Sequence, residues 1–116
     1  MFQAAKETIR WPNHAKCAVL LTIHVDGESL YNRNPQAPSP RRVSYGKYGP
    51  MRAVDRLLEL TQRKGIPCSY FIPGQIAERY PEMVKKIDAC GYEIGFHGFD
   101  HDCLLYTSDA ADELDG

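Results

Sequence analysis

The fold of this chain is decided by a strand–helix–strand pattern in residues 66–96, IPCSYFIPGQIAERYPEMVKKIDACGYEIGF. Residues 66–72 form a short apolar run bounded by proline and glycine, which predicts a buried strand. Pro81 can occupy the first turn of a helix, and Gly91 stands where such a helix would end. Residues 92–96 form another short apolar run and predict a further strand. The pattern therefore predicts two strands joined by a helix.

Two more elements are expected before this unit. The apolar run of residues 17–25 predicts the first strand. Residues 50–65 predict an amphipathic helix, because apolar residues recur at helical spacing and Gly65 stands at the C-terminal cap position. Residues 30–49 contain several prolines and many polar residues, so we expect a long loop there. Strands that alternate with helices predict an α/β fold with three parallel strands and right-handed crossovers.

Acidic and histidine side chains follow the first and the third of these strands. The first strand leads into residues 24–28, HVDGE, and the third leads into His97 and His101. Because the carboxyl ends of parallel strands meet at one edge, we expect Asp26 and His97 on the same rim. Two imidazoles and one carboxylate can hold a divalent metal and leave positions open for water and a substrate oxygen. We therefore predict Asp26, His97 and His101 as metal ligands.

The cysteines add one alternative ligand. The four cysteines contain no Cys-x-x-Cys pair, so neither a zinc finger nor a redox motif is expected. Cys103 follows His101 by two residues and is an alternative, softer ligand for zinc.

Composition excludes several kinds of partner. The chain has 116 residues, 43% hydrophobic and 25% charged, which is typical of one soluble globular unit. Its formal net charge of −1 and pI near 6.4 provide no basic field for a phosphate backbone, so we expect no nucleic-acid partner. The amino terminus is charged where a signal peptide needs an apolar region, and no run approaches a membrane-spanning length. We therefore expect no membrane partner and a cytoplasmic location.

Four segments in order resemble the polysaccharide deacetylase family, also called the NodB-homology or carbohydrate esterase family 4 domain. Residues 22–28, TIHVDGE, are similar to its first motif in the form Thr-Phe-Asp-Val-Asp-Gly-Glu, found in the cytoplasmic peptidoglycan-deacetylase-like and allantoinase-like branch. Residues 97–101, HGFDH, are similar to its second motif, His-Ser/Gly-x-x-His. Residues 44–49 and 69–74 also resemble segments of that branch, and the whole match runs over residues 11–102.

The resemblance implies a distorted (β/α) TIM-like barrel and a zinc or other divalent ion held by Asp26, His97 and His101. It implies hydrolysis of a non-peptide carbon–nitrogen bond in an oligosaccharide or small-molecule amide, with removal of acetyl groups from N-acetylated sugars. A cyclic amide or imide hydrolase, similar to allantoinase or imidase, is an alternative. An inactive truncated domain is the third hypothesis.

The general base is open, because His24 stands where this branch of the family carries an aspartate. Since side chains of a strand alternate between its faces, His24 shares a face with Asp26, and Glu28 can lie there too. His24 could accept a proton itself, or it could be a replacement that abolishes activity. Glu28 is the other candidate base. The predicted catalytic residues are therefore His24 and Glu28.

Length predicts that the barrel is incomplete. An eight-stranded α/β barrel typically needs about 250 residues, whereas this chain supplies three strands. We interpret residues 17–104 as the N-terminal part of the domain, after a lead-in of residues 1–16. Residues 105–116, LYTSDAADELDG, resemble translated sequencing-adapter read-through and are interpreted as a non-native tail. We expect an enzyme at full length, with a homo-oligomer open as its assembly state, and an inactive fragment here.

Overall fold

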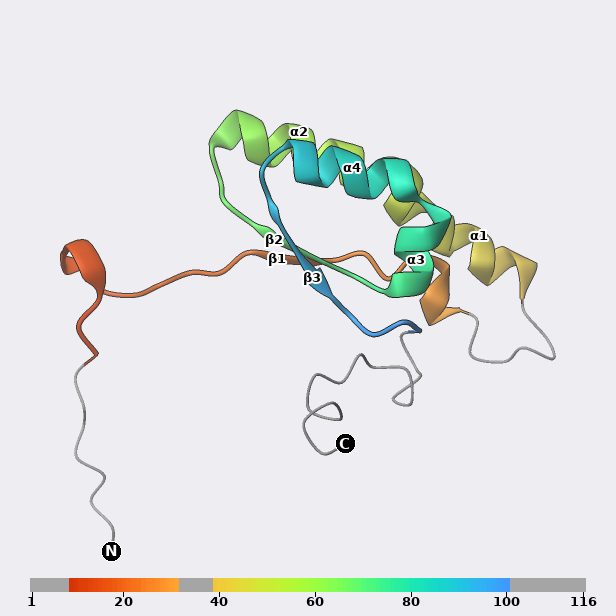
Figure 1. Cartoon of the computed structure of the whole chain (residues 1–116), viewed down its shortest axis with the longest axis horizontal. Helices are drawn as coiled ribbons and strands as arrows, with labels where there is room; N and C mark the ends of the chain where they lie inside the picture. The colour runs from red at the N-terminus through yellow and green to blue at the C-terminus, as the bar shows by residue number, and fades with distance from the viewer. Residues whose placement is uncertain (1–8, 32–38, 101–116) are drawn as a thin grey trace, which may run out of the picture.

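A three-stranded parallel sheet in the order β1-β2-β3 is the centre of the structure (Figure 1). This computed structural model describes residues 9–31 and 39–100. The described elements are, in chain order, a 3₁₀ turn at Pro12–His14, β1 at Thr22–His24, a 3₁₀ turn at Gly27–Leu30, α1 at Pro40–Tyr48, a π-helical turn at Gly49–Ala53, α2 at Val54–Lys64, β2 at Ser69–Ile72, α3 at Gly74–Arg79, α4 at Pro81–Ala89 and β3 at Glu93–Phe96.

The core lies between the sheet and the helices α2 and α4, which lie together over one face of the sheet (Figure 1). Tyr70 and Ile72 of the central strand are buried on this side. The buried apolar residues are Val25, Val54, Leu58, Cys68, Tyr70, Ile72, Ile76, Met83 and Ile87. A fully buried aliphatic side chain contributes about 1.5–3 kcal/mol, so this one-sided core is the main source of stability.

The opposite face of the sheet carries a different row of side chains. In the parallel register His24 pairs with Phe71, and Phe71 pairs with Gly95. Paired residues of a sheet point to the same side, and alternation places these three opposite Tyr70. The row crosses all three strands next to their carboxyl ends.

The structure confirms the α/β fold class and the three parallel strands predicted from the sequence. It also confirms the end of α2. Gly65 has φ 63°, its amide donates to the Gln62 carbonyl, and the Ile66 amide donates to the Thr61 carbonyl. These two bonds form a Schellman motif, which favours glycine because other residues are strained at positive φ.

The first strand is shorter than predicted. Residues 17–25 were expected to be one buried strand, but only Thr22–His24 is β1, and Val19 and Leu20 are 89% and 85% exposed. Pro67 explains where the ladder starts, because a proline has no amide hydrogen to donate before β2 begins at Ser69.

The prediction of a loop over residues 30–49 is wrong for its second half, which forms α1. Pro40 stands in the first turn of this helix, where a missing amide hydrogen costs nothing, and no proline follows it within α1. Residues 32–38 lie outside the described residues. The short helix α3 was not predicted, because Pro73-Gly74 indicated only the end of a strand.

No helix in the described ranges combines the length and apolar character needed to cross a lipid bilayer.

Replacing the cap glycine tests the helix end. We expect Gly65→Ala to lower the free energy of unfolding by about 1 kcal/mol, because alanine is strained at positive φ. Gln62→Ala is the matched control, since Gln62 is an exposed residue of the same helix, where alanine is well tolerated. Denaturant unfolding should rank Gln62→Ala close to the unchanged chain, and equal stability of the two variants would contradict this interpretation of the cap.

Candidate metal centre

Two backbone hydrogen bonds at the carboxyl end of β2 bring the predicted ligands to one rim. The Val25 amide donates to the Phe71 carbonyl at 2.9 Å, and the His97 amide donates to the Ile72 carbonyl at 3.3 Å. Asp26 directly follows Val25. The central strand therefore fixes the backbone next to Asp26 on one side and at His97 on the other.

The chain after His97 is held by the start of α3. The amides of Gly74 and Gln75 donate to the carbonyls of Gly98 and Phe99 at 2.8 and 2.9 Å. The first amides of a helix have no partner within the helix, so this loop satisfies two of them. The segment from His97 to Phe99 is thus held by the end of β2 and by the start of α3.

His24, Asp26 and His97 form a group of donor side chains whose ligand atoms all lie within 4.8 Å of one another. His97 Nε2 lies 3.3 Å from Asp26 Oδ1, and the rings of His24 and His97 meet edge to face with centroids 4.7 Å apart. The side chains of Asp26 and His97 are 19% and 31% exposed, so solvent still reaches them. Two imidazoles and one carboxylate fit zinc or a similar divalent ion.

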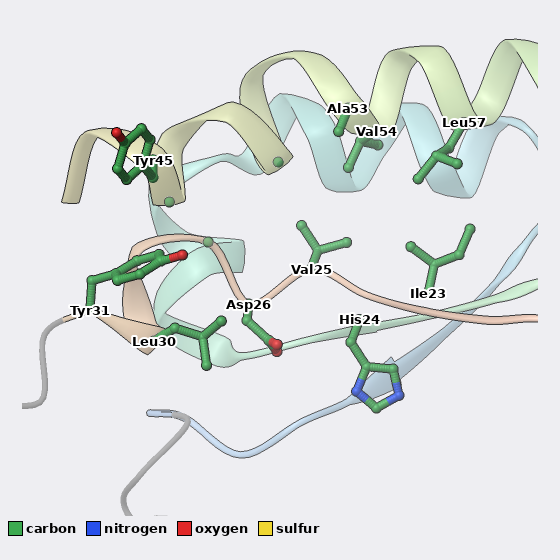
Figure 2. A pocket seen from close by; sticks show the side chains of 13 residues that line it. Ile23, His24, Val25, Asp26, Leu30, Tyr31, Tyr45, Ala53, Val54 and Leu57 are labelled. Atoms are coloured by element: carbon green, nitrogen blue, oxygen red, sulfur yellow. The ribbon is translucent and has the colours of Figure 1, made fainter. Parts of the chain in front are cut away.

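Alternation along β1 separates this donor group from the core. Figure 2 shows Ile23 and Val25 pointing toward α2, which carries Val54 and Leu57, whereas His24 and Asp26 point to the opposite side of the strand. Each polar side chain therefore follows an apolar one that packs against a helix.

Phe71 packs against His24 on the face of the sheet that carries His24, Phe71 and Gly95, called the open face below. Their ring centroids lie 5.3 Å apart with a tilted geometry. Gly95 makes this possible, because a Cβ at that position would lie 2.5 Å from the Phe71 ring. No role for Phe71 or Gly95 was predicted from the sequence. A glycine inside a strand is the signal that could have indicated such a close approach.

Glu28 lies outside the donor group and is fully buried. Its Oε1 accepts a hydrogen bond from Tyr80 Oη and lies 3.4 Å from Nη1 of the partly exposed Arg79. Burial, and then the hydrogen bond to Glu28, raises the pKa of Tyr80 to about 12. Gly27 explains this placement: its φ of 54° begins a 3₁₀ turn and ends the alternation that His24 and Asp26 follow.

The structure thus brings together Asp26 and His97, as predicted, and adds His24 to them. Glu28 is directed to the start of α4 instead. The predicted ligand His101 and the alternative ligand Cys103 lie outside the described residues.

A sequence profile of the family described as polysaccharide deacetylase matches residues 47–115, more than half of the chain. The chain belongs to this family. The family resemblance inferred from the sequence motifs is therefore confirmed. The matched range includes His97 and His101 and also extends into residues 105–116, whose interpretation as a non-native tail stays a prediction.

Two curated relatives of this chain carry names that refer to peptidoglycan deacetylase. A peptidoglycan deacetylase from Helicobacter pylori is 34% identical over 64 residues, which cover 55% of this chain and 22% of the relative. A peptidoglycan deacetylase-like protein from Gibberella zeae is 35% identical over 80 residues, which cover 66% of this chain and 22% of the relative. The chain therefore spans about a fifth of the length of these relatives.

A solved structure has a similar fold. The crystal structure of a Mycobacterium smegmatis protein, described as a polysaccharide deacetylase, superimposes with a TM-score of 0.77 and 36% identity. The match covers 90% of this chain and 37% of that one. Polysaccharide deacetylases have a (β/α) barrel fold, in which helices lie outside the strands. The open face with His24, Phe71 and Gly95 therefore corresponds to the barrel interior.

Gly95→Ala tests the packing under His24. The added methyl group must displace the Phe71 ring, so we expect the imidazole proton resonances of His24 to shift and stability to fall by about 1–3 kcal/mol. Proton NMR and denaturant unfolding measure the two effects. The Gln62→Ala variant, which changes an exposed residue of α2, should leave the His24 resonances in place, and unshifted resonances in Gly95→Ala would contradict the contact.

The pKa of Tyr80 tests the burial of Glu28. Because the folded pKa lies above the ordinary value of 10, the contribution of this group to stability should fall as pH rises from 10 toward 12. Glu28→Gln should lower the pKa of Tyr80 toward 10 without reaching it, because burial remains. Ultraviolet titration of tyrosinate, with Tyr80→Phe to identify the transition, measures this pKa; an unchanged value in Glu28→Gln would contradict the contact.

Proposed function

We propose that this chain is part of a metal-dependent hydrolase that removes acetyl groups from N-acetylated sugars. Family membership and the two relatives named for peptidoglycan deacetylation support this substrate class. The observation that carries the proposal is the convergence of His24, Asp26 and His97 at the carboxyl ends of β1 and β3. Asp26, His97 and His101 are the proposed ligands, and zinc or another divalent ion is the proposed metal.

A bound ion at this position would polarise the amide carbonyl and lower the pKa of a water molecule to about 7. The chain itself fixes where the ligand atoms lie. Asp26 and His97 hold their donor atoms 3.3 Å apart, which fits neighbouring ligands on one tetrahedral ion at about 3.4 Å. The β2 carbonyls and the α3 amides hold the backbone behind them, so little reorganisation is needed on binding.

Of the two candidate bases, His24 lies within the donor group and Glu28 does not. We assign Glu28 to positioning, because its buried carboxylate ties the turn after Asp26 to Tyr80 and Arg79. Buried charges are retained where they are paired and hydrogen-bonded, which this contact provides.

Cytoplasmic location and homo-oligomer formation stay predictions, as does inactivity of the chain alone. A barrel interior needs strands on all sides of the metal, and the three strands described here form one part of that wall. Activity is therefore best tested in a protein that has the remaining strands of the barrel.

Zinc occupancy tests the ligands directly. His97→Ala and His101→Ala should each lower the affinity of the chain for zinc by at least about tenfold, because each removes a donor. Isothermal titration and metal analysis of the purified chain measure this. His14→Asn, which changes an exposed histidine outside the donor group, is the control. Stoichiometric zinc in the double variant would contradict the site.

A chimera tests the reaction. Residues 17–102, which include His101, would replace the matched part of the Mycobacterium smegmatis protein, which supplies the rest of the barrel. We expect the zinc-loaded chimera to release acetate from N-acetylglucosamine oligomers and to lose this activity with Asp26→Asn. Ring opening of small cyclic imides without acetate release would favour the alternative imide hydrolase. Absence of both activities in a folded, zinc-loaded chimera would favour the inactive domain.

A further inference from the structure

His24 lies where a ligand of the ion would lie. Its ring nitrogen is within 4.8 Å of both the Asp26 carboxylate and the His97 imidazole. The ring is exposed on the open face of the sheet, at the carboxyl end of β1. These distances alone are compatible with a ligand or with a general base, so the orientation of the two rings decides between them.

The two imidazoles are spaced as rings that share one ion. A zinc–nitrogen bond of about 2.0–2.1 Å puts the ring centre about 3.2 Å from the ion. Two such rings at ligand angles of about 90–110° have centroids about 4.5–5.2 Å apart. The observed centroid distance of His24 and His97 is 4.7 Å, with the rings nearly perpendicular at 79°.

Two rings lie against His24. Its ring centroid is 5.3 Å from that of Phe71 and 4.7 Å from that of His97. The His24 ring is still exposed, so the spacing of the two imidazoles, and not exclusion of water, is the observation that favours a ligand over a general base.

We propose that His24 is itself a ligand of the metal, beside Asp26 and His97, and takes no part as the proton acceptor. This inference rests on the metal site of the proposed function. It makes the donor set richer in imidazole than the family motif, which carries an aspartate at this position. With His101 the protein donors would number four, so the water of the proposed function would need a fifth position on the ion. Imidazole nitrogen favours zinc, nickel and copper, whereas carboxylate oxygen favours magnesium and manganese, so His24 shifts the metal preference toward the first group.

Nitrogen NMR of the full chain with labelled histidine tests the assignment. On addition of one equivalent of Zn²⁺ we expect ring-nitrogen resonances of both His24 and His97 to move by the large shift that coordination causes. His14 should stay in place. His24→Gln identifies the His24 resonances and should bind Zn²⁺ at least about tenfold more weakly than the unchanged chain.

Metal selectivity gives a second, independent readout. His24→Asp restores the carboxylate that the family motif carries and keeps a donor in place. Isothermal titration should show that the ratio of Ni²⁺ to Mn²⁺ affinity falls in this variant, since a nitrogen donor is exchanged for oxygen. His14→Asn should leave the ratio unchanged, and circular dichroism confirms that each variant is folded.

The outcomes separate the two proposals. If Zn²⁺ shifts His97 but not His24, and His24→Gln keeps its zinc affinity within about twofold, His24 is no ligand and the metal site of the proposed function stands. If Zn²⁺ shifts neither histidine in the folded chain, the metal site of the proposed function fails and this inference fails with it.

Discussion

The parallel pairing of β2 with strands on both of its sides is the constraint on which the rest of the described structure depends. Its last two carbonyls, those of Phe71 and Ile72, accept hydrogen bonds from the amides of Val25 and His97. Its side chains divide the sheet into two faces: Tyr70 and Ile72 are in the core, and Phe71 supports the donor group. The core and the candidate metal site thus lie on opposite faces of the same four-residue strand.

Much of the fold could be predicted because it follows from local patterns. Apolar runs bounded by proline and glycine located β2 and β3, and the cap at Gly65 located the end of α2. The start of α1 and the extent of β1 could not be predicted, because each depends on contacts with other parts of the fold. Pro40 can either interrupt a segment or start a helix, and the choice depends on what the following turns pack against. The extent of β1 depended on its partner, since Pro67 withholds an amide from the ladder.

The candidate site was predictable to the extent that topology decides it. Parallel strands expose their carboxyl ends together, so the sequence alone predicts Asp26 and His97 on one rim. Period-2 alternation placed His24 beside Asp26. The same rule could not follow Glu28, because Gly27 turns the backbone into a 3₁₀ conformation. The contact of Phe71 with His24 joins two strands. It depends on the register between them, which the sequence of either strand alone does not give.

The separation of the donors along the chain has a thermodynamic consequence. Asp26 and His97 are seventy-one positions apart, and sheet pairing alone brings their carboxylate and imidazole together. An ion bound between them would act as a cross-link that closes this long loop, and it would favour the folded chain over an unfolded one in which the donors are scattered. Ion concentration and the folding equilibrium would then be linked, so such a cation would stabilise the folded chain in addition to any part in the reaction.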